Sequence, residues 1–171
     1  MLIGLLAVML VLGLAGCKSA SEKIGEEIGE AVVGGAVGAD VEVDEDRVTI
    51  ETDDGVATIA GGEGMLVAEF PDDFPLYKDA DIETSTYFGA SDGRDQVYVL
   101  LSTGDPVGDV YDWYKSELGQ AGWEITQDAK MTTGDGEMAQ LAAESDDREA
   151  ALMINSDGGE TQIVVNVYIG E

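Results

Sequence analysis

Residues 96–118 read QVYVLLSTGDPVGDVYDWYKSEL, and within this stretch the hydrophobic pattern changes from that of a strand to that of a helix. Residues 96–102 are rich in β-branched and aromatic side chains, which predicts a strand. Asp105 and Pro106 have the residue types of a helix N-cap and first helical position, and Gly122 is placed to end the helix. The apolar face of this helix carries Val107, Val110, Tyr114 and Leu118. The chain therefore passes here from a strand into one amphipathic helix.

Short apolar segments separated by turn residues surround this strand and helix. They cover residues 82–88, 123–126, 138–143, 149–154 and 162–169. Turns such as Asp146-Asp147 and Asp157-Gly158-Gly159 are tight enough to join antiparallel strands. The sequence therefore predicts an α+β domain over residues 65–171. Its expected element order is β-β-α-β-β-β-β, with a mainly antiparallel sheet that carries the helix on one face.

Residues 40–64 form a separate alternating segment in front of this domain. Apolar and polar side chains alternate along it, and Asp53-Asp54-Gly55 supplies a turn. The pattern predicts a small β-hairpin ribbon that ends in a Gly-rich joint at residues 61–64. Because a ribbon of two or three strands is not stable alone, we expect it to pack on the sheet or to extend it.

The first 16 residues carry no charge and end in Leu14-Ala15-Gly16, directly before Cys17. This run is shorter than the roughly 20 residues of a membrane-spanning helix, and it has the length of a signal peptide. The sequence Leu14-Ala15-Gly16-Cys17 resembles the lipobox of bacterial lipoproteins.

The lipobox resemblance implies cleavage before Cys17, diacylglycerol on its thiol, and a further acyl chain such as palmitate on the new N-terminus. Residues 1–16 are then the signal peptide, and residues 17–39 are a Gly/Glu-rich tether that follows the lipidated cysteine. The resemblance implies a cell-envelope location, with the lipid in the membrane and the domain on the extracytoplasmic side. The alternative is a short, uncleaved transmembrane segment with an incidental cysteine.

A second resemblance lies within the domain. Phe74-Pro75-Leu76-Tyr77 is followed by Tyr114-Lys115-Ser116-Glu117-Leu118 and then by Gly122-Trp123. This order of Pro-x-Tyr, Tyr-x-x-x-Leu and Gly-Trp resembles a domain of uncharacterised bacterial lipoproteins, over about residues 70–125. The resemblance implies a fold and an envelope location, and it implies no activity.

The chain is strongly acidic, because 36 Asp and Glu against 8 Lys and Arg give a formal net charge of −28. Such a field repels nucleic acid and anionic lipid headgroups, so we expect no nucleic-acid partner. Cys17 is the only cysteine, which excludes an intramolecular disulfide. The chain has no histidine, the residue most often used as a general base and as a metal ligand.

The acidic clusters do not form a recognisable metal or catalytic motif. A loop that starts at Asp79 has Thr84 at its sixth position and Ala90 at its twelfth, where an EF-hand has Gly and Glu. Nothing in the sequence singles out a carboxylate pair of the glycosidase kind, or a nucleophile with its base. We therefore expect no enzyme activity, no cofactor and no dedicated metal site. A weak cation site between adjacent acidic loops remains an alternative.

Alternation along the strands assigns side chains to two faces of the sheet. The face expected under the helix carries Val97, Val99, Leu101, Leu152, Ile154, Ile163, Val165, Val167 and Ile169. The other face carries Tyr87, Tyr98, Leu100, Met153, Val164 and Tyr168, and is more apolar than a solvated face should be. Either the ribbon accounts for this face, or the face binds a partner protein or a ligand.

The sequence thus predicts a lipid-anchored envelope protein whose domain acts by binding, with an envelope protein as the expected partner. Two alternatives stay open: an acidic module that responds to calcium, and, third, a small carboxylate-dependent hydrolase.

Overall fold

The computed structural model describes residues 40–44, 47–61, 64–91, 93–133 and 136–170. They all belong to one compact unit, Ala36–Glu171. The predicted signal peptide, Cys17 and the tether lie outside the described residues. Within the part that is described, no helix is both long enough and apolar enough to cross a membrane.

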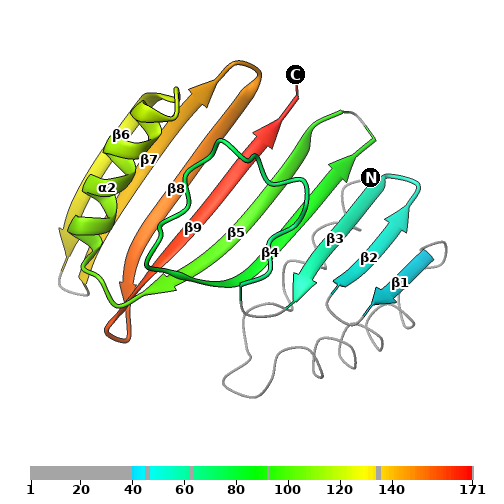
Figure 1. The fold of residues 1–171 in the computed structure, drawn as a ribbon, viewed down its shortest axis with the longest axis horizontal. Helices are drawn as coiled ribbons and strands as arrows, with labels where there is room; N and C mark the ends of the chain where they lie inside the picture. Colours follow the sequence, from blue (N-terminus) through cyan, green and yellow to red (C-terminus); the bar gives the residue numbers. More distant parts are fainter. Residues whose placement is uncertain (1–39, 45–46, 62–63, 92, 134–135, 171) are drawn as a thin grey trace. The chain divides into compact units, whose positions relative to one another are not determined.

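The described residues build a nine-stranded sheet in which every pair of neighbouring strands is antiparallel (Figure 1). In spatial order the strands are β1 (Asp40–Asp44), β2 (Arg47–Thr52), β3 (Gly55–Gly61), β4 (Asp81–Ala90), β5 (Asp95–Thr103), β9 (Glu160–Ile169), β8 (Arg148–Asp157), β7 (Gly136–Ser145) and β6 (Glu124–Thr133). One helix, α2 (Val107–Gln120), connects β5 to β6. The α+β class and the mainly antiparallel sheet predicted from the sequence are confirmed.

The predicted ribbon extends the sheet. Strands β1, β2 and β3 are joined in sequence, and β3 pairs with β4 from Gly55 opposite Ala90 to Gly61 opposite Thr84. The ribbon therefore satisfies its backbone hydrogen bonds along the edge of the larger sheet and does not lie over either face.

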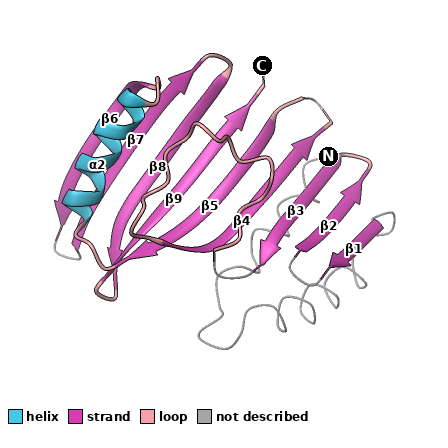
Figure 2. Ribbon diagram, in the orientation of Figure 1, coloured by secondary structure: helices cyan, strands magenta, loops and turns pink. Residues whose placement is uncertain are grey.

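One face of the sheet is covered by a helix and by a loop segment. Helix α2 packs against β6, β7 and β8. Residues 64–80, which we call the covering segment, cross the neighbouring part of the same face as a loop without regular structure (Figure 2). Val67, Phe70, Phe74 and Tyr77 of this segment are buried in the same core as the helix.

Hydrogen bonds fix the covering segment to the sheet at both of its ends. The backbone N–H of Val67 donates to Ser85 Oγ at 2.9 Å, and Ser85 Oγ donates in turn to the Met65 carbonyl at 3.0 Å. At the other end, Thr103 Oγ1 donates to the Asp79 carbonyl at 2.9 Å. A loop can lie on a core only where its backbone polar groups find partners, and these bonds supply several of them.

The core between these layers contains the side chains that alternation assigned to it. Val97, Val99, Leu101, Leu152, Ile154, Ile163, Val165 and Val167 are buried, and Ile169 is partly buried against them. Large aromatic side chains complete the core: Phe74 meets Trp123 edge to face at 5.1 Å, and Trp113 meets Tyr114 at 4.9 Å.

The two ends of α2 differ in how well the sequence predicted them. Gly122 has φ +87°, and the N–H of Trp123 donates to the Leu118 carbonyl at 2.9 Å, so the helix ends in a Schellman motif at the expected glycine. The predicted N-cap was wrong. Pro106 occupies the cap position, and its ring has no group that could cap the helix. The Asp105 carboxylate accepts a hydrogen bond from Tyr77 Oη at 2.6 Å.

Candidate functional site

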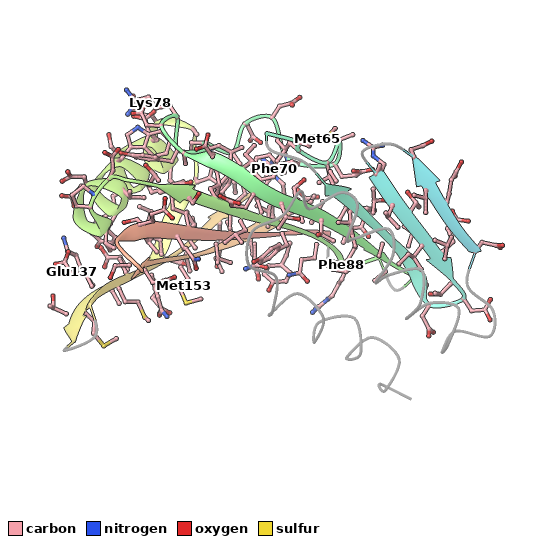
Figure 3. The ribbon with its side chains drawn as sticks, turned by 90° about the horizontal axis from the view of Figure 1, so that it is seen from below. Met65, Phe70, Lys78, Phe88, Glu137 and Met153 are labelled. Carbon is pink, nitrogen blue, oxygen red and sulfur yellow. The ribbon has the colours of Figure 1, made fainter. Side chains whose placement is uncertain are left out.

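The second face of the sheet is the candidate binding surface. Figure 3 views the sheet from its side and shows Met65, Phe70 and Lys78 on the covered side, with Phe88 and Met153 on the opposite side. Strand pairing places six apolar side chains together on that opposite side, around β9. We call them the open face: Tyr98, Leu100, Ala151, Met153, Val164 and Tyr168.

Two rows of side chains cross this face, one on each side of its centre, and neither contains a charged residue. The Tyr98 row consists of Val43, Val48, Ile59, Thr86, Tyr98, Asn166, Ala151, Ala142 and Gln127. The Leu100 row consists of Gly61, Thr84, Leu100, Val164, Met153, Gln140 and Ala129. Charged residues make up 26% of the chain, so two uncharged rows of this length are not what the composition alone would give.

Apolar side chains on β5, β9 and β8 are accessible to solvent, as are Val41 and Val43 on β1 and Met131 on β6. Met153 is 39% exposed and Tyr168 is 43% exposed, whereas Tyr98, Leu100 and Val164 are half-buried. Burial raises the pKa of the Tyr98 hydroxyl above its ordinary value. Farther along the Tyr98 row, Val48, Ile59 and Thr86 are buried, whereas Val43 at the end of the row on β1 is 62% exposed.

The prediction for Tyr87 was wrong, because this residue lies on the covered side. Tyr87 pairs with Val97, and its ring packs against the main core. The pairing of β4 with β5 shifts by one residue between Ile82 and Thr84, and this bulge reverses the alternation for the rest of the strand. Phe88 takes the place on the open side that simple alternation gave to Tyr87.

Tyr87 has a structural role where it lies. Its hydroxyl donates to Asp95 Oδ2 at 2.9 Å, and the N–H of Ala90 donates to Asp95 Oδ1 at 3.3 Å. Burial and the hydrogen bond to Asp95 raise the pKa of Tyr87 to about 12. Tyr87 therefore closes the β4–β5 hairpin and takes no part in the candidate surface.

Polar side chains lie at the centre and at the rim of the open face. At the centre, Asn166 Oδ1 accepts a hydrogen bond at 2.9 Å from Nε2 of Gln96, which lies beside Tyr168, and this bond orders both amides. At the rim, Glu149 lies opposite Tyr168 in the strand register, and Ser102 Oγ donates to Glu83 at 2.5 Å. An uncharged centre with carboxylates at the rim is the usual composition of a protein interface.

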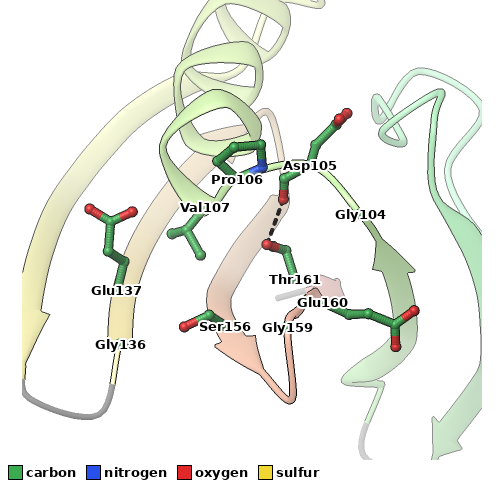
Figure 4. Close-up of a pocket in the computed structure, with 10 residues that line it drawn as sticks. All are labelled: Gly104, Asp105, Pro106, Val107, Gly136, Glu137, Ser156, Gly159, Glu160 and Thr161. Atoms are coloured by element: carbon green, nitrogen blue, oxygen red, sulfur yellow. Dashed lines mark hydrogen bonds between the residues drawn. The ribbon is translucent and has the colours of Figure 1, made fainter.

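A separate pocket of about 390 Å³ lies between the start of α2, the start of β7 and the β8–β9 turn (Figure 4). Its acidic side chains do not converge. Glu137 and Glu160 lie on opposite sides of the pocket, and the Asp105 carboxylate accepts a hydrogen bond from the Tyr77 hydroxyl. Within the described ranges, no three acidic or cysteine side chains are grouped so that they could hold a metal ion.

The acidic residues of the loops weighed as a weak cation site do not gather in one place in the described part of the chain. Asp79 lies 3.7 Å from the Lys78 ammonium on the surface, and Asp81 begins β4. Asp92 and Asp135, which belong to two of the acidic turns, lie outside the described residues, as does Cys17. The structure brings together Tyr98, Leu100, Met153 and Tyr168. The sequence argument missed Ala151 and Asn166, because each is unremarkable until its neighbours across the sheet are known.

A family model described as START domain-like matches residues 82–162, from β4 to β9. A search of the curated proteins gives no match. Among solved structures, the solution structure of cyanobacterial PsbP (CyanoP) from Synechocystis sp. PCC 6803 is similar, with 10% sequence identity and a TM-score of 0.40. That similarity covers 92% of this chain and 87% of the other.

Proposed function

We propose that this chain is a lipid-anchored envelope protein whose α+β domain binds a protein partner through the open face and has no catalytic role. The observation that carries the proposal is the pair of uncharged rows across the sheet in a chain with a net charge of −28. Half-exposed Met and Tyr side chains in such a setting are typical of an interface core.

The anchoring part of the proposal is supported by the sequence Leu14-Ala15-Gly16-Cys17. Lipid on Cys17 would hold the domain at a membrane that its own charge repels. We expect Cys17→Ser to move the protein out of the washed membrane fraction and to remove the mass of the lipid from the N-terminal peptide. Unchanged membrane retention of Cys17→Ser, with an unmodified wild-type peptide, would disprove the anchor.

The binding part is tested by chemical cross-linking in native membranes with the double substitution Tyr98→Ala and Tyr168→Ala. Lys78→Ala is the matched control, because its side chain is 73% exposed on the covered side. We expect the wild type and the control to give a discrete cross-linked product and the double variant to lose it while its circular dichroism stays native. A wild type without any product would rule out the binding role, and a double variant that unfolds would assign these tyrosines to folding.

The two alternatives gain no support from the described residues. A calcium-responsive module needs converging carboxylates, and those around the pocket of Figure 4 lie apart. A hydrolase needs two carboxylates in different environments across a cleft, and none of Asp105, Glu137 and Glu160 is set in such a pair.

A further inference from the structure

We infer that the occupant of the open face is a second copy of this chain, packed sheet on sheet about a twofold axis that runs along β9. This inference rests on the proposed function and names the partner. In such a dimer β5 of each copy lies over β8 of the other, so Tyr98 of one copy faces Ala151 of the other.

Charge restricts where two copies can meet. Each copy carries a formal charge of −28, so most approaches bring carboxylates together. The Tyr98 and Leu100 rows let two copies touch without placing charge against charge. A basic partner, by contrast, would be attracted to the acidic surfaces and would gain nothing from uncharged rows.

The shapes of the rows fit a twofold axis along β9. In the Tyr98 row, Asn166 on β9 is flanked by a large residue, Tyr98, on β5 and a small one, Ala151, on β8. The axis exchanges β5 with β8, so each large ring is set against a small side chain, twice in the dimer. Sheets that pack face to face interdigitate in this way.

The two neighbouring rows fit the same axis. Val164 is flanked by Leu100 and by Met153, whose unbranched side chain adapts to the surface it meets. Tyr168 is flanked by Gln96 and Glu149, so the axis sets each carboxylate against an amide and away from its own symmetry copy. All three rows therefore avoid like charge across the axis, and Tyr168, which lies on the axis, faces the same ring of the other copy.

The area available predicts a weak dimer. The strands placed symmetrically about β9 are β4, β5, β9, β8 and β7. Five strands, each about 4.8 Å wide, and the three rows, each about 6.8 Å wide, give a surface of roughly 24 by 20 Å per copy. Two such surfaces bury about 1,000 Å², which is near the lower limit of specific interfaces. Anchoring both copies in one membrane raises their effective concentration, so association is expected in the membrane before it is expected in dilute solution.

The first test is cross-linking of the full chain in native membranes through a cysteine at Val164, which lies on the proposed axis. Facing sheets are about 10 Å apart, whereas a disulfide needs Cα atoms about 4.4 to 6.8 Å apart, so a short bismaleimide is used. Asp112→Cys, exposed on α2, is the matched control, and the wild type reports any reaction at Cys17. We expect a product of twice the monomer mass from Val164→Cys and none from the other two.

The second test is an exchange of bulk across the axis, in the Val164→Cys background. Tyr98→Ala and Ala151→Tyr should each lower the yield of cross-linked dimer by about fivefold or more, because one leaves a gap and the other overfills it. The double exchange restores large against small and should return the yield to within about twofold of the parent. If the open face binds a partner other than a second copy, the two substitutions are not expected to compensate each other.

Four results would overturn the inference: a Val164→Cys product of another mass without the dimer, no rescue by the double exchange, a dimer from Asp112→Cys in equal yield, or no product at all. The first leaves the open face as a binding surface and refutes only the second copy. A lack of any product at both Val164→Cys and the exposed Met153→Cys refutes the dimer and the proposed function together. Protease resistance equal to that of the wild type shows for each variant that the domain is folded.

Discussion

Replacing Tyr114 with Phe tests how the covering segment is held on the core. The Tyr114 side chain is fully buried, and its hydroxyl accepts a hydrogen bond from the backbone N–H of Tyr77 at 3.2 Å. The substitution keeps the ring and leaves this buried N–H without its acceptor, which costs about 1 to 3 kcal/mol. We expect a loss of about 2 kcal/mol, or roughly 6 to 8 °C in Tm for a domain of this size.

The measurement is urea and thermal unfolding, followed by the fluorescence of Trp113 and Trp123. Tyr111→Phe is the matched control, since its hydroxyl donates at 3.0 Å to Asp128, a carboxylate that is 43% exposed and can bind water instead. We expect the control to lose less than about 0.5 kcal/mol. If Tyr114→Phe loses no more than Tyr111→Phe, the argument that this buried bond anchors the covering segment is wrong.

Three further predictions follow from the contacts of the covered face and from the acidic turns. Arg148 donates two hydrogen bonds to Asp73, at 2.6 and 2.7 Å. A double-mutant cycle with Arg148→Gln and Asp73→Asn should give a coupling free energy of about 0.5 to 1 kcal/mol, because the exposure of Asp73 limits the strength of the pair. A coupling near zero would show that the pair does not hold the covering segment. Hydrogen bonds to carboxylates and burial raise the pKa of Tyr77 and Tyr87 from 10.0 to about 12. Their contribution to the free energy of unfolding is therefore complete below pH 10 and is lost as the pH rises toward 12. Phenolate absorbance and the free energy of unfolding, both measured as a function of pH, check this, and tyrosines that all titrate near pH 10 in the folded protein would contradict it. Calcium should raise Tm no more than a sodium salt of equal ionic strength does, and a larger rise would favour the cation-responsive alternative.

Local patterns predicted the individual elements well. The apolar spacing from Val107 to Leu118 and the glycine at residue 122 determine a helix and its end, because helical periodicity and a left-handed C-terminal residue act within a few positions. Alternation likewise predicted the core side of β5 and β9, from Val97 to Val167. These assignments need no information on what the strand pairs with.

The sequence predicted the candidate site only in part. The errors of this prediction arise from tertiary structure. Tyr87 changed sides because of a bulge near Glu83, which alternation along one strand cannot reveal. Asp105 has the residue type of an N-cap, but its carboxylate accepts a hydrogen bond from the hydroxyl of Tyr77, which is far from it in sequence. In both cases a contact between distant segments overrode a local preference.

The sequence by itself determined the composition of this protein, the positions of its strands and helix, and the strong excess of negative charge. Tertiary structure alone decided that β9 lies between β5 and β8, and this placement brings Tyr98, Asn166 and Ala151 into one uncharged row. The reason is that propensity and periodicity are properties of neighbouring residues, whereas a surface is made by strands that meet only after the chain has folded.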